Sequence, residues 1–337
     1  MALRIIVVGC GSIGKRHLGN LKALGVENLV AVDTRKDRLQ EVTERIGSEI
    51  LCSDNLSEQL KSKCDGVVVC VPTSIHLDVA KEAIKSGASV LIEKPLSNTS
   101  EGVPELLSLA KESSLVVAVG YTYRFWPALQ KIKYFLENDQ IGQIYSANII
   151  FSEYLPDWHP WEDYRSWFMA KKELGGGALL DESHAIDIMR WLFGEARTIY
   201  GVNGTFSKLE IDSDDLAEII VRFHSGVIGS IHMDIYGRHH RKELSIQGEL
   251  GNIYWDFYKN TVALYQANLE KWEVIQFEDD RNDMFLNEVR HWLNAIQGGP
   301  KVPVDGYDAL KTLSFALAAI ESSMNDKVVE PFGAIDK

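Results

Sequence analysis

The sequence predicts a two-domain protein, with a doubly wound parallel α/β sheet first and an α+β domain with an open-faced antiparallel sheet second. Short apolar runs alternate with amphipathic helical stretches over the first 120 residues, whereas strands of period two dominate from about residue 196 to 277. The first pattern is typical of βαβ units and the second of antiparallel strands. Because the pattern changes near residue 122, the expected domains are 1–122 and 123–337.

The parallel sheet of the first domain is expected from five apolar runs that are too short to be helices. The amphipathic stretches between them include two that close at Gly25 and Gly87, and glycine directly after a helix is a common C-terminal signal. Apolar runs without alternation indicate strands that are buried on both faces. The runs are Leu3–Val8, Leu29–Val32, Gly66–Val71, Val90–Ile92 and Leu115–Val119.

The second domain is expected to have helices on one face of its sheet. Its strands, such as Asp215–Phe223 and Val227–Ile235, alternate apolar and polar residues, which is typical of a sheet with one covered face. The basic run Arg238–Lys242 is expected to be a solvated hairpin end. The expected helices are residues 127–137, about 177–193, 282–297 and 305–323.

The composition and charge exclude several classes of partner. The chain of 337 residues has a net charge of −13, which disfavours binding to nucleic acid or to an anionic membrane surface. Its longest apolar runs are far too short to span a bilayer, and Met1 leads directly into a strand pattern without a signal peptide. Its four cysteines lie in the first 70 residues without metal-ligand spacing, so we expect no metal site and reduced thiols in the cytoplasm.

A G-x-G-x-x-G motif lies between the first apolar run and the first helical stretch. Its glycines permit a tight turn and close approach of a pyrophosphate, and the helix N-terminus supplies N–H donors. Asp33 ends the next strand, 19 residues after Gly14, where a carboxylate accepts ribose hydroxyls and repels a 2′-phosphate. The pattern therefore predicts a Rossmann domain that prefers NAD. The expected phosphate-binding residues are Gly9, Gly11, Ser12, Ile13 and Gly14.

Two arginines leave the choice of cofactor open. Arg35 and Arg38 follow Asp33 closely and could hold the 2′-phosphate of NADP. Solvated charges are the favoured interpretation, so NAD is the first expectation and NADP the alternative.

Three further segments carry a resemblance to a known family. They are Val-Cys-Val-Pro-Thr-Ser-Ile-His at 69–76, Glu-Lys-Pro at 93–95, and Gly-Gly-Gly-Ala-Leu-Leu-Asp-Glu-Ser-His-Ala-Ile-Asp at 175–187. With the glycine motif, they resemble the glucose–fructose oxidoreductase/inositol dehydrogenase (Gfo/Idh/MocA) family from about residue 3 to 330. Gly120–Leu129 and Tyr154–Lys172 are similar to family members of surface-polysaccharide sugar synthesis.

The resemblance implies a nicotinamide cofactor between the two domains and hydride transfer at a secondary hydroxyl or keto carbon. The implied substrate is a sugar, amino sugar, nucleotide sugar or cyclitol. Lys94 of the Glu-Lys-Pro motif also follows a parallel strand at its carboxyl end, where ligands bind in such sheets. Further cofactor contacts are implied for Val71, Pro72, Thr73, His76, Glu93 and Lys94.

The family pattern assigns proton transfer to Lys94 and to His184, and both are also implied to bind substrate. His184 considered alone would fit a satisfied core histidine. The family places an Asp four residues before this His, whereas here that position is Leu180 and Asp181 is three before it. A shift by one position rotates a side chain by about 100°, but residues three apart on one helix are still neighbours. Asp181 is the candidate third catalytic residue, and Asp187 is a substrate or orienting group.

Aromatic and basic residues of the second domain are candidates for substrate recognition. Trp158, Trp161 and Trp167 crowd into ten residues, and a flat aromatic face suits the apolar face of a sugar ring. A packed loop or a subunit contact would explain these tryptophans equally well. Arg124 and Arg165 could form a fork for a carboxylate or phosphate. Trp161, Arg124 and Arg165 are therefore expected substrate contacts.

The favoured function is an NAD(P)-dependent dehydrogenase, and two alternatives stay open. One is an NAD-dependent glycoside hydrolase of the same fold, which recycles its cofactor. The other is a non-catalytic nucleotide-binding sensor, against which the retained Lys94 and His184 weigh.

The sheet of the second domain also predicts an assembly. Apolar positions on its strands are expected on a face that nothing obvious in the chain covers, and such a face usually marks an interface. A homodimer or homotetramer through this sheet is expected. The positions are Ile219, Val221, Ile228 and Ile231.

Overall fold

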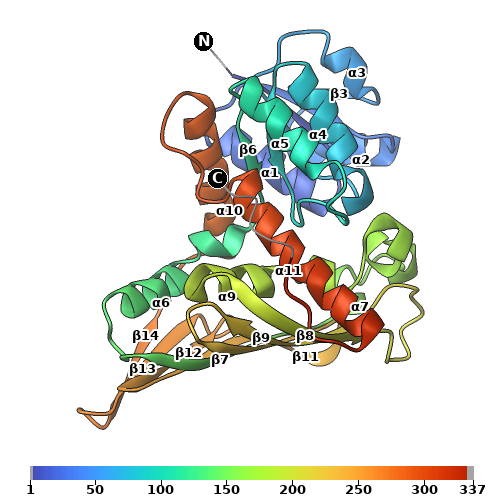
Figure 1. Ribbon diagram of the computed structural model, residues 1–337. Helices are drawn as coiled ribbons and strands as arrows, with labels where there is room; N and C mark the ends of the chain where they lie inside the picture. Colours follow the sequence, from blue (N-terminus) through green and yellow to red (C-terminus); the bar gives the residue numbers. More distant parts are fainter. Residues whose placement is uncertain (1–2, 332–337) are drawn as a thin grey trace. The chain divides into compact units, whose positions relative to one another are not determined.

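The computed structural model describes residues 3–331 and divides the chain into two compact units (Figure 1). The first unit runs to Thr122 and also contains Arg281–Leu310, whereas the second contains Tyr123–Asp280 and the chain from Lys311 on. The structure therefore agrees with a division at residue 122 but differs in that Arg281–Leu310 returns to the first unit. No helix in residues 3–331 is both long and apolar enough to cross a membrane.

Helix α10 (Arg281–Ile296) belongs to the first unit because its apolar face completes that unit's core. Trp292 is fully buried in a cluster with Ile5 and Leu21, and Gly66 gives it space. A Cβ atom at Gly66 would lie 2.6 Å from the Trp292 ring. The amphipathic pattern of α10 predicts a helix but does not indicate which sheet the helix covers.

The first unit contains a six-stranded sheet in the order β3-β2-β1-β4-β5-β6, and its pairs are parallel. This order confirms the doubly wound Rossmann arrangement, with the reversal of strand order between β1 and β4. The strands are β1 (Arg4–Val8), β2 (Asn28–Val32), β3 (Leu51–Ser53), β4 (Gly66–Val69), β5 (Ser89–Ile92) and β6 (Val117–Val119). The other helices of this unit are α1 (Ser12–Ala23), α2 (Lys36–Arg45), α3 (Leu56–Gln59), α4 (His76–Lys85) and α5 (Val103–Glu112).

The second unit contains an eight-stranded sheet in the order β14-β13-β12-β11-β7-β10-β9-β8. The expectation of an antiparallel sheet is corrected at one pair, because β7 and β10 run parallel. Alternation along a strand shows which face is covered but does not fix the direction of its neighbour. The strands are β7 (Ile144–Tyr154), β8 (Ala196–Gly204), β9 (Leu216–Phe223), β10 (Ile228–Asp234), β11 (Tyr236–Gly248), β12 (Gly251–Asp256), β13 (Thr261–Gln266) and β14 (Lys271–Gln276).

Helices cover one face of this sheet, as expected. Figure 1 shows α6 and α9 along the same face. Helix α11 lies against β8, because a Cβ atom at Gly201 would be 2.8 Å from the carbonyl oxygen of Ala319. The helices that complete the unit are α6 (Pro127–Glu137), α7 (Leu155–Trp158), α8 (Ala178–Asp181), α9 (His184–Phe193) and α11 (Gly306–Asn325), whose first residues belong to the first unit.

Three of the four apolar residues expected on the uncovered face of this sheet lie on its covered face. Ile219, Val221 and Ile231 are buried, so these positions face the helices rather than a partner. The uncovered face has the opposite phase: Ile228 lies there as expected, and Ile220 is 54% exposed. An alternation of period two does not tell which of the two faces of the sheet is covered. The prediction of an uncovered face was therefore wrong for three of the four residues.

Candidate active site

The turn between β1 and α1 requires glycine at two positions. Gly9 has a φ of 90°, and a Cβ atom there would lie 2.3 Å from the carbonyl oxygen of Cys70. A Cβ atom at Gly14 would lie 1.8 Å from the carbonyl oxygen of Gly9. At Gly11, by contrast, a Cβ atom would meet only the Arg38 side chain, at 3.8 Å. The turn therefore leaves an open cradle at Gly11, directly before the N-terminus of α1 at Ser12 and Ile13.

The Asp33 carboxylate is fixed beside this cradle at the end of β2. Its Oδ2 atom accepts a hydrogen bond from the Cys10 N–H at 2.7 Å, and its Oδ1 atom accepts one from the Arg35 N–H at 2.8 Å. The Arg38 guanidinium lies 3.5 Å from Oδ2. The carboxylate of Asp33 and the cradle at Gly11 fit the ribose and the pyrophosphate of a dinucleotide, respectively.

The side chain of Arg35 is bound to a neighbouring acid. It pairs with the exposed carboxylate of Asp37, and this hydrogen bond lowers the pKa of Asp37 to about 2. Arg35 thus matches the interpretation as a solvated charge, and its backbone N–H is what it contributes to Asp33.

The loop after β4 is joined to the loop after β5 by His76. A short 3₁₀ turn, Thr73–Ile75, follows Val71 and Pro72. The buried His76 ring has one nitrogen 2.9 Å from the Val71 carbonyl oxygen and the other 2.9 Å from the Pro95 carbonyl oxygen. Burial lowers the pKa of His76 despite these contacts. His76 therefore has backbone partners on both sides, which is a structural role, and the expected cofactor contact stays a prediction.

Glu93 and Lys94 follow β5 directly. The Glu93 Oε1 atom lies 2.7 Å from Nε2 of His17, and Oε2 accepts the Lys94 N–H at 3.3 Å. Burial alone would raise the pKa of Glu93, but the hydrogen bond with His17, the charges of His17 and Lys94 and the Lys94 N–H together lower it. The Glu93 carboxylate thus has internal partners and holds the backbone at Lys94, and its expected cofactor contact stays a prediction.

The helix expected from about 177 to 193 is two helices. Helix α8 ends at Asp181 and α9 begins at His184, with Glu182 and Ser183 between them. The continuous helix that was expected to make Asp181 and His184 neighbours is therefore interrupted between them. His184 is largely buried, and its ring lies 4.8 Å from the Tyr123 ring in an edge-to-face arrangement.

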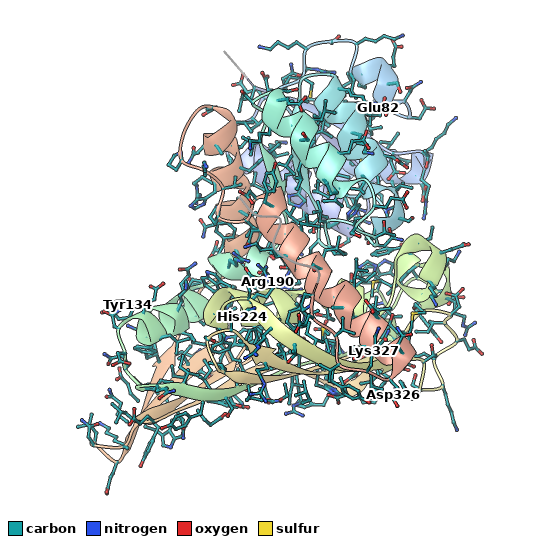
Figure 2. The ribbon with its side chains drawn as sticks, viewed as in Figure 1. Glu82, Tyr134, Arg190, His224, Asp326 and Lys327 are labelled. Atoms are coloured by element: carbon teal, nitrogen blue, oxygen red, sulfur yellow. The ribbon has the colours of Figure 1, made fainter. Side chains whose placement is uncertain are left out.

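Two expected substrate ligands, Arg124 and Asp187, bind each other instead. The guanidinium of Arg124 donates two hydrogen bonds to the Asp187 carboxylate, at 2.8 and 2.7 Å, and both side chains are buried. Thr312 donates a further hydrogen bond to Asp187 at 3.1 Å. Arg190, labelled in Figure 2, donates to the Thr312 hydroxyl at 2.6 Å and extends the network.

The expected fork of Arg124 and Arg165 is therefore not present in the described residues. Arg165 is exposed, and its Nε atom lies 2.6 Å from the Glu210 carboxylate. Trp161 is 76% exposed and stacks on His159, with the ring centroids 5.2 Å apart.

A buried charged cluster beside His184 was missed by the sequence interpretation. The Lys242 Nζ atom lies 3.3 Å from a carboxylate oxygen of Glu153 and 3.3 Å from one of Glu182. The Tyr258 hydroxyl donates to Glu153 as well. Burial would lower the pKa of Lys242, yet the carboxylates raise it well above its ordinary value.

This cluster reaches His184 through an aromatic side chain. Lys242 lies 5.6 Å from the centre of the Tyr123 ring, which packs on His184. The expectation of a solvated hairpin end at Arg238–Lys242 was wrong, because these residues form part of strand β11. One signal was present in the sequence, because Lys242 is in phase with the buried Leu244 and Ile246.

Comparisons with known proteins agree with this architecture. Residues 3–121 match the model of an oxidoreductase family with an NAD-binding Rossmann fold, and residues 129–254 match the Gfo/Idh/MocA C-terminal domain. The chain is 28% identical to a myo-inositol 2-dehydrogenase from Thermotoga maritima, over 98% of this chain and 100% of that protein. It is 26% identical to a scyllo-inositol 2-dehydrogenase (NAD(+)) from Bacillus subtilis, over 97% and 96% of the two chains.

Solved structures show the same fold at lower identity. A levoglucosan dehydrogenase in complex with NADH and levoglucosan superposes with a TM-score of 0.87 at 21% identity, covering 98% of this chain and 100% of that one. The WlbA dehydrogenase from Bordetella pertussis, in complex with NADH and UDP-GlcNAcA, superposes with a TM-score of 0.82 at 22% identity, covering 98% and 99%. From residue 3 to residue 254, with one short gap, the chain matches both family models, and it belongs to the Gfo/Idh/MocA family of oxidoreductases.

Proposed function

We propose that this protein is an NAD-dependent dehydrogenase that acts on a secondary hydroxyl or keto carbon of a sugar or cyclitol. The observation that carries the proposal is the glycine cradle with the fixed Asp33 carboxylate beside it, in a chain of an oxidoreductase family. The relatives named as inositol and levoglucosan dehydrogenases support the substrate class. A location in the cytoplasm stays a prediction.

The first unit has the groups that a dinucleotide needs. The backbone at Gly11 and the first N–H groups of α1 would hold the pyrophosphate, and Asp33 would accept hydrogen bonds from the ribose. Bound NAD supplies the hydride acceptor for oxidation and, when reduced, the hydride donor. Lys94 follows β5 at the carboxyl end of the same parallel sheet, the edge at which ligands of such sheets bind.

The proton chemistry is assigned to Lys94 and His184. As a secondary alcohol loses hydride, its hydroxyl proton must be accepted by a base. The ammonium group of Lys94 would stabilise the developing alkoxide, and the His184 ring would accept the proton. Asp181, the last residue of α8, is assigned as an orienting group for His184, the first residue of α9.

The polar groups near His184 favour an uncharged polyol as substrate. Glu153 and Glu182 offer carboxylate oxygens, which suit hydroxyl donors, whereas the guanidinium of Arg124 is occupied by Asp187. Because Arg124 is paired with Asp187, it does not offer a free cation to the carboxylate of an acidic sugar. A nucleotide sugar remains the alternative that the exposed Arg165 would serve.

A panel of substrates tests the proposal and separates its two rivals. The enzyme with NAD is incubated with cyclitols, neutral sugars, acidic sugars and nucleotide sugars, and the absorbance of NADH is followed. Steady NADH formation with a neutral polyol is the expected result. Cleavage of a glycoside without net NADH would favour the glycoside hydrolase, and nucleotide binding without any turnover would favour the sensor.

Asp33→Ala is expected to weaken NAD binding and to improve the binding of NADP relative to NAD. The variant removes the acceptor of the ribose hydroxyls and the charge that repels a 2′-phosphate. Titration of each cofactor gives the ratio, with Glu44→Ala as the control that removes an exposed acid of α2. A wild-type preference for NADP of about tenfold or more, equal to about 1.4 kcal/mol, would contradict the assignment.

We also propose that the protein forms a homodimer or homotetramer through the uncovered face of the second sheet. Ile220→Arg is expected to lower the mass measured by light scattering, because it places a charge within an apolar contact. Leu51→Arg, at an equally exposed position of the first unit, is the control and should leave the mass unchanged. A monomeric wild type at micromolar concentration would refute the assembly.

A further inference from the structure

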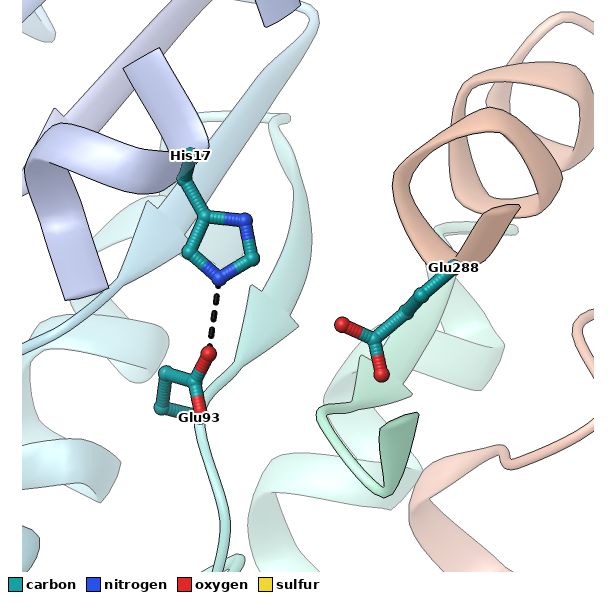
Figure 3. Close-up of side chains that lie close together, drawn as sticks. All are labelled: His17, Glu93 and Glu288. Carbon is teal, nitrogen blue, oxygen red and sulfur yellow. Dashed lines mark hydrogen bonds and ion pairs between the residues drawn. The ribbon is translucent and has the colours of Figure 1, made fainter. Parts of the chain in front are cut away.

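A buried acidic cluster in the first unit adjoins the residue that precedes Lys94. His17 of α1, Glu93 after β5 and Glu288 of α10 each offer one nitrogen or oxygen atom, and these atoms lie within 4.8 Å of one another. Figure 3 shows the Glu288 carboxyl group directed toward the hydrogen bond between His17 and Glu93. The cluster thus joins a helix near the end of the chain to the loop that carries Lys94.

Glu288 lacks the partners that a buried carboxylate needs. It is 4% exposed, and neither of its carboxyl oxygens has a hydrogen-bond partner in the described residues. An ionised carboxylate in such a place is costly, so the group takes up a proton. Burial and then the charge of Glu93 raise the pKa of Glu288 well above its ordinary value. The groups that face it are His17, Glu93 and the Cys70 thiol.

We propose that Glu288 is a positioning residue for Lys94: it stands as a neutral acid beside the His17–Glu93 pair and keeps the single negative charge of the cluster on Glu93. The proposal rests on the proposed function, in which Lys94 takes part in proton transfer. It assigns Glu288 no contact with substrate or cofactor.

The connection from Glu288 to Lys94 passes through the Glu93 carboxylate. One oxygen of Glu93 is held by His17 at 2.7 Å, and the other accepts the Lys94 N–H at 3.3 Å. A negative charge at this place favours the ammonium form of the lysine. The Glu288 carboxyl group lies within 4.8 Å of the His17–Glu93 pair and is directed toward it (Figure 3).

The geometry favours a protonated Glu288 over a bound metal ion. Nε2 of His17, the nitrogen nearest the cluster, is hydrogen-bonded to Glu93. A cation would have to break this bond to use that nitrogen as a ligand. Bound metal is therefore an outcome of the test that would overturn the proposal.

Urea unfolding at several pH values tests whether Glu288 is neutral. If it is, folding takes up a proton, so the wild type loses stability as the pH rises from the ordinary pKa of Glu toward the raised one. Glu288→Gln has no such proton. Its urea midpoint is expected to rise relative to wild type from about pH 5 to about pH 8. The exposed Glu101→Gln is the control and should show a constant difference. A constant difference for Glu288→Gln as well would overturn the proposal.

The pH profile of kcat tests the positioning role. Glu93→Gln should move the limb that depends on Lys94 to lower pH, because the lysine loses a stabilising charge. Glu288→Leu leaves the charge on Glu93, so it should keep this limb in place and lower kcat with KM little changed. Glu288→Gln, which preserves the shape of the neutral acid, should restore the wild-type kcat and profile. A tenfold loss of kcat in Glu288→Gln would show that ionised Glu288 is required.

Two further results separate the possible failures. One divalent cation per chain in the purified wild type, lost in Glu288→Gln, would make the cluster a metal centre and overturn the proposal. Wild-type activity in Lys94→Ala would contradict the proposed function and with it any positioning role. The urea comparison would still report whether Glu288 is neutral, so the two failures are distinguishable.

Discussion

Lys94→Ala is expected to lower kcat by about 10²–10⁴-fold, the usual effect of losing a positioned acid–base group. His184→Ala should cause a loss of similar size while NAD affinity stays almost unchanged, because the cofactor is held by the first unit. The double variant should lose less than the product of the two single losses, since groups that act on one hydroxyl are not additive. Steady-state kinetics and NAD titration of the three variants provide the measurement.

Lys85→Ala is the matched control for these variants, because Lys85 is an exposed lysine of the same unit. It should keep wild-type kinetics. The acid limb of the kcat profile should disappear in His184→Ala. If that variant kept its kcat and its acid limb, the assignment of His184 as the base would be wrong. Asp181→Asn should cause a smaller loss than His184→Ala, and an equal loss would make Asp181 a catalytic residue in its own right.

Asp187→Ala is expected to lower the free energy of unfolding by about 3–5 kcal/mol, because it leaves the buried guanidinium of Arg124 without its carboxylate. Urea unfolding measures the change, and the exposed Asp54→Ala should change stability by less than about 0.5 kcal/mol. The double variant Arg124→Met/Asp187→Leu should recover much of the loss, since an apolar pair can replace a buried ion pair. A fully stable Asp187→Ala with a large rise in KM would instead make Asp187 a substrate ligand.

The parts of the site that the sequence predicted depend on local patterns. The glycine turn, the acid at the end of β2 and Lys94 after β5 each follow a strand that its apolar run already reveals. Such residues are fixed by backbone geometry within a few positions, so spacing is enough to find them. The Rossmann sheet was predictable for the same reason.

The parts that were not predicted depend on partners far away in the sequence. The break between α8 and α9 at Glu182 has no glycine or proline to mark it, and Glu182 pairs with Lys242, 60 residues later. Arg124 and Asp187 are 63 residues apart, and each alone has the character of a substrate ligand. Only the packed structure shows that these charges neutralise each other.

Helix α10 illustrates the same limit at the level of domains. Its amphipathic pattern was visible, but its membership of the first unit depends on Trp292 fitting beside Gly66, a glycine more than two hundred residues earlier. The buried Glu288 on that helix could not be separated from an ordinary surface glutamate by its spacing.

The most direct test of the central claim is the formation of NADH by the wild-type enzyme, Lys94→Ala and Lys85→Ala with the same panel of cyclitols and neutral sugars. Steady NADH formation with at least one neutral polyol is expected in the wild type and in Lys85→Ala. In Lys94→Ala the expected rate is lower by about 10²–10⁴-fold. Tight NAD binding without NADH formation from any polyol, or equal rates in all three proteins, would contradict this claim.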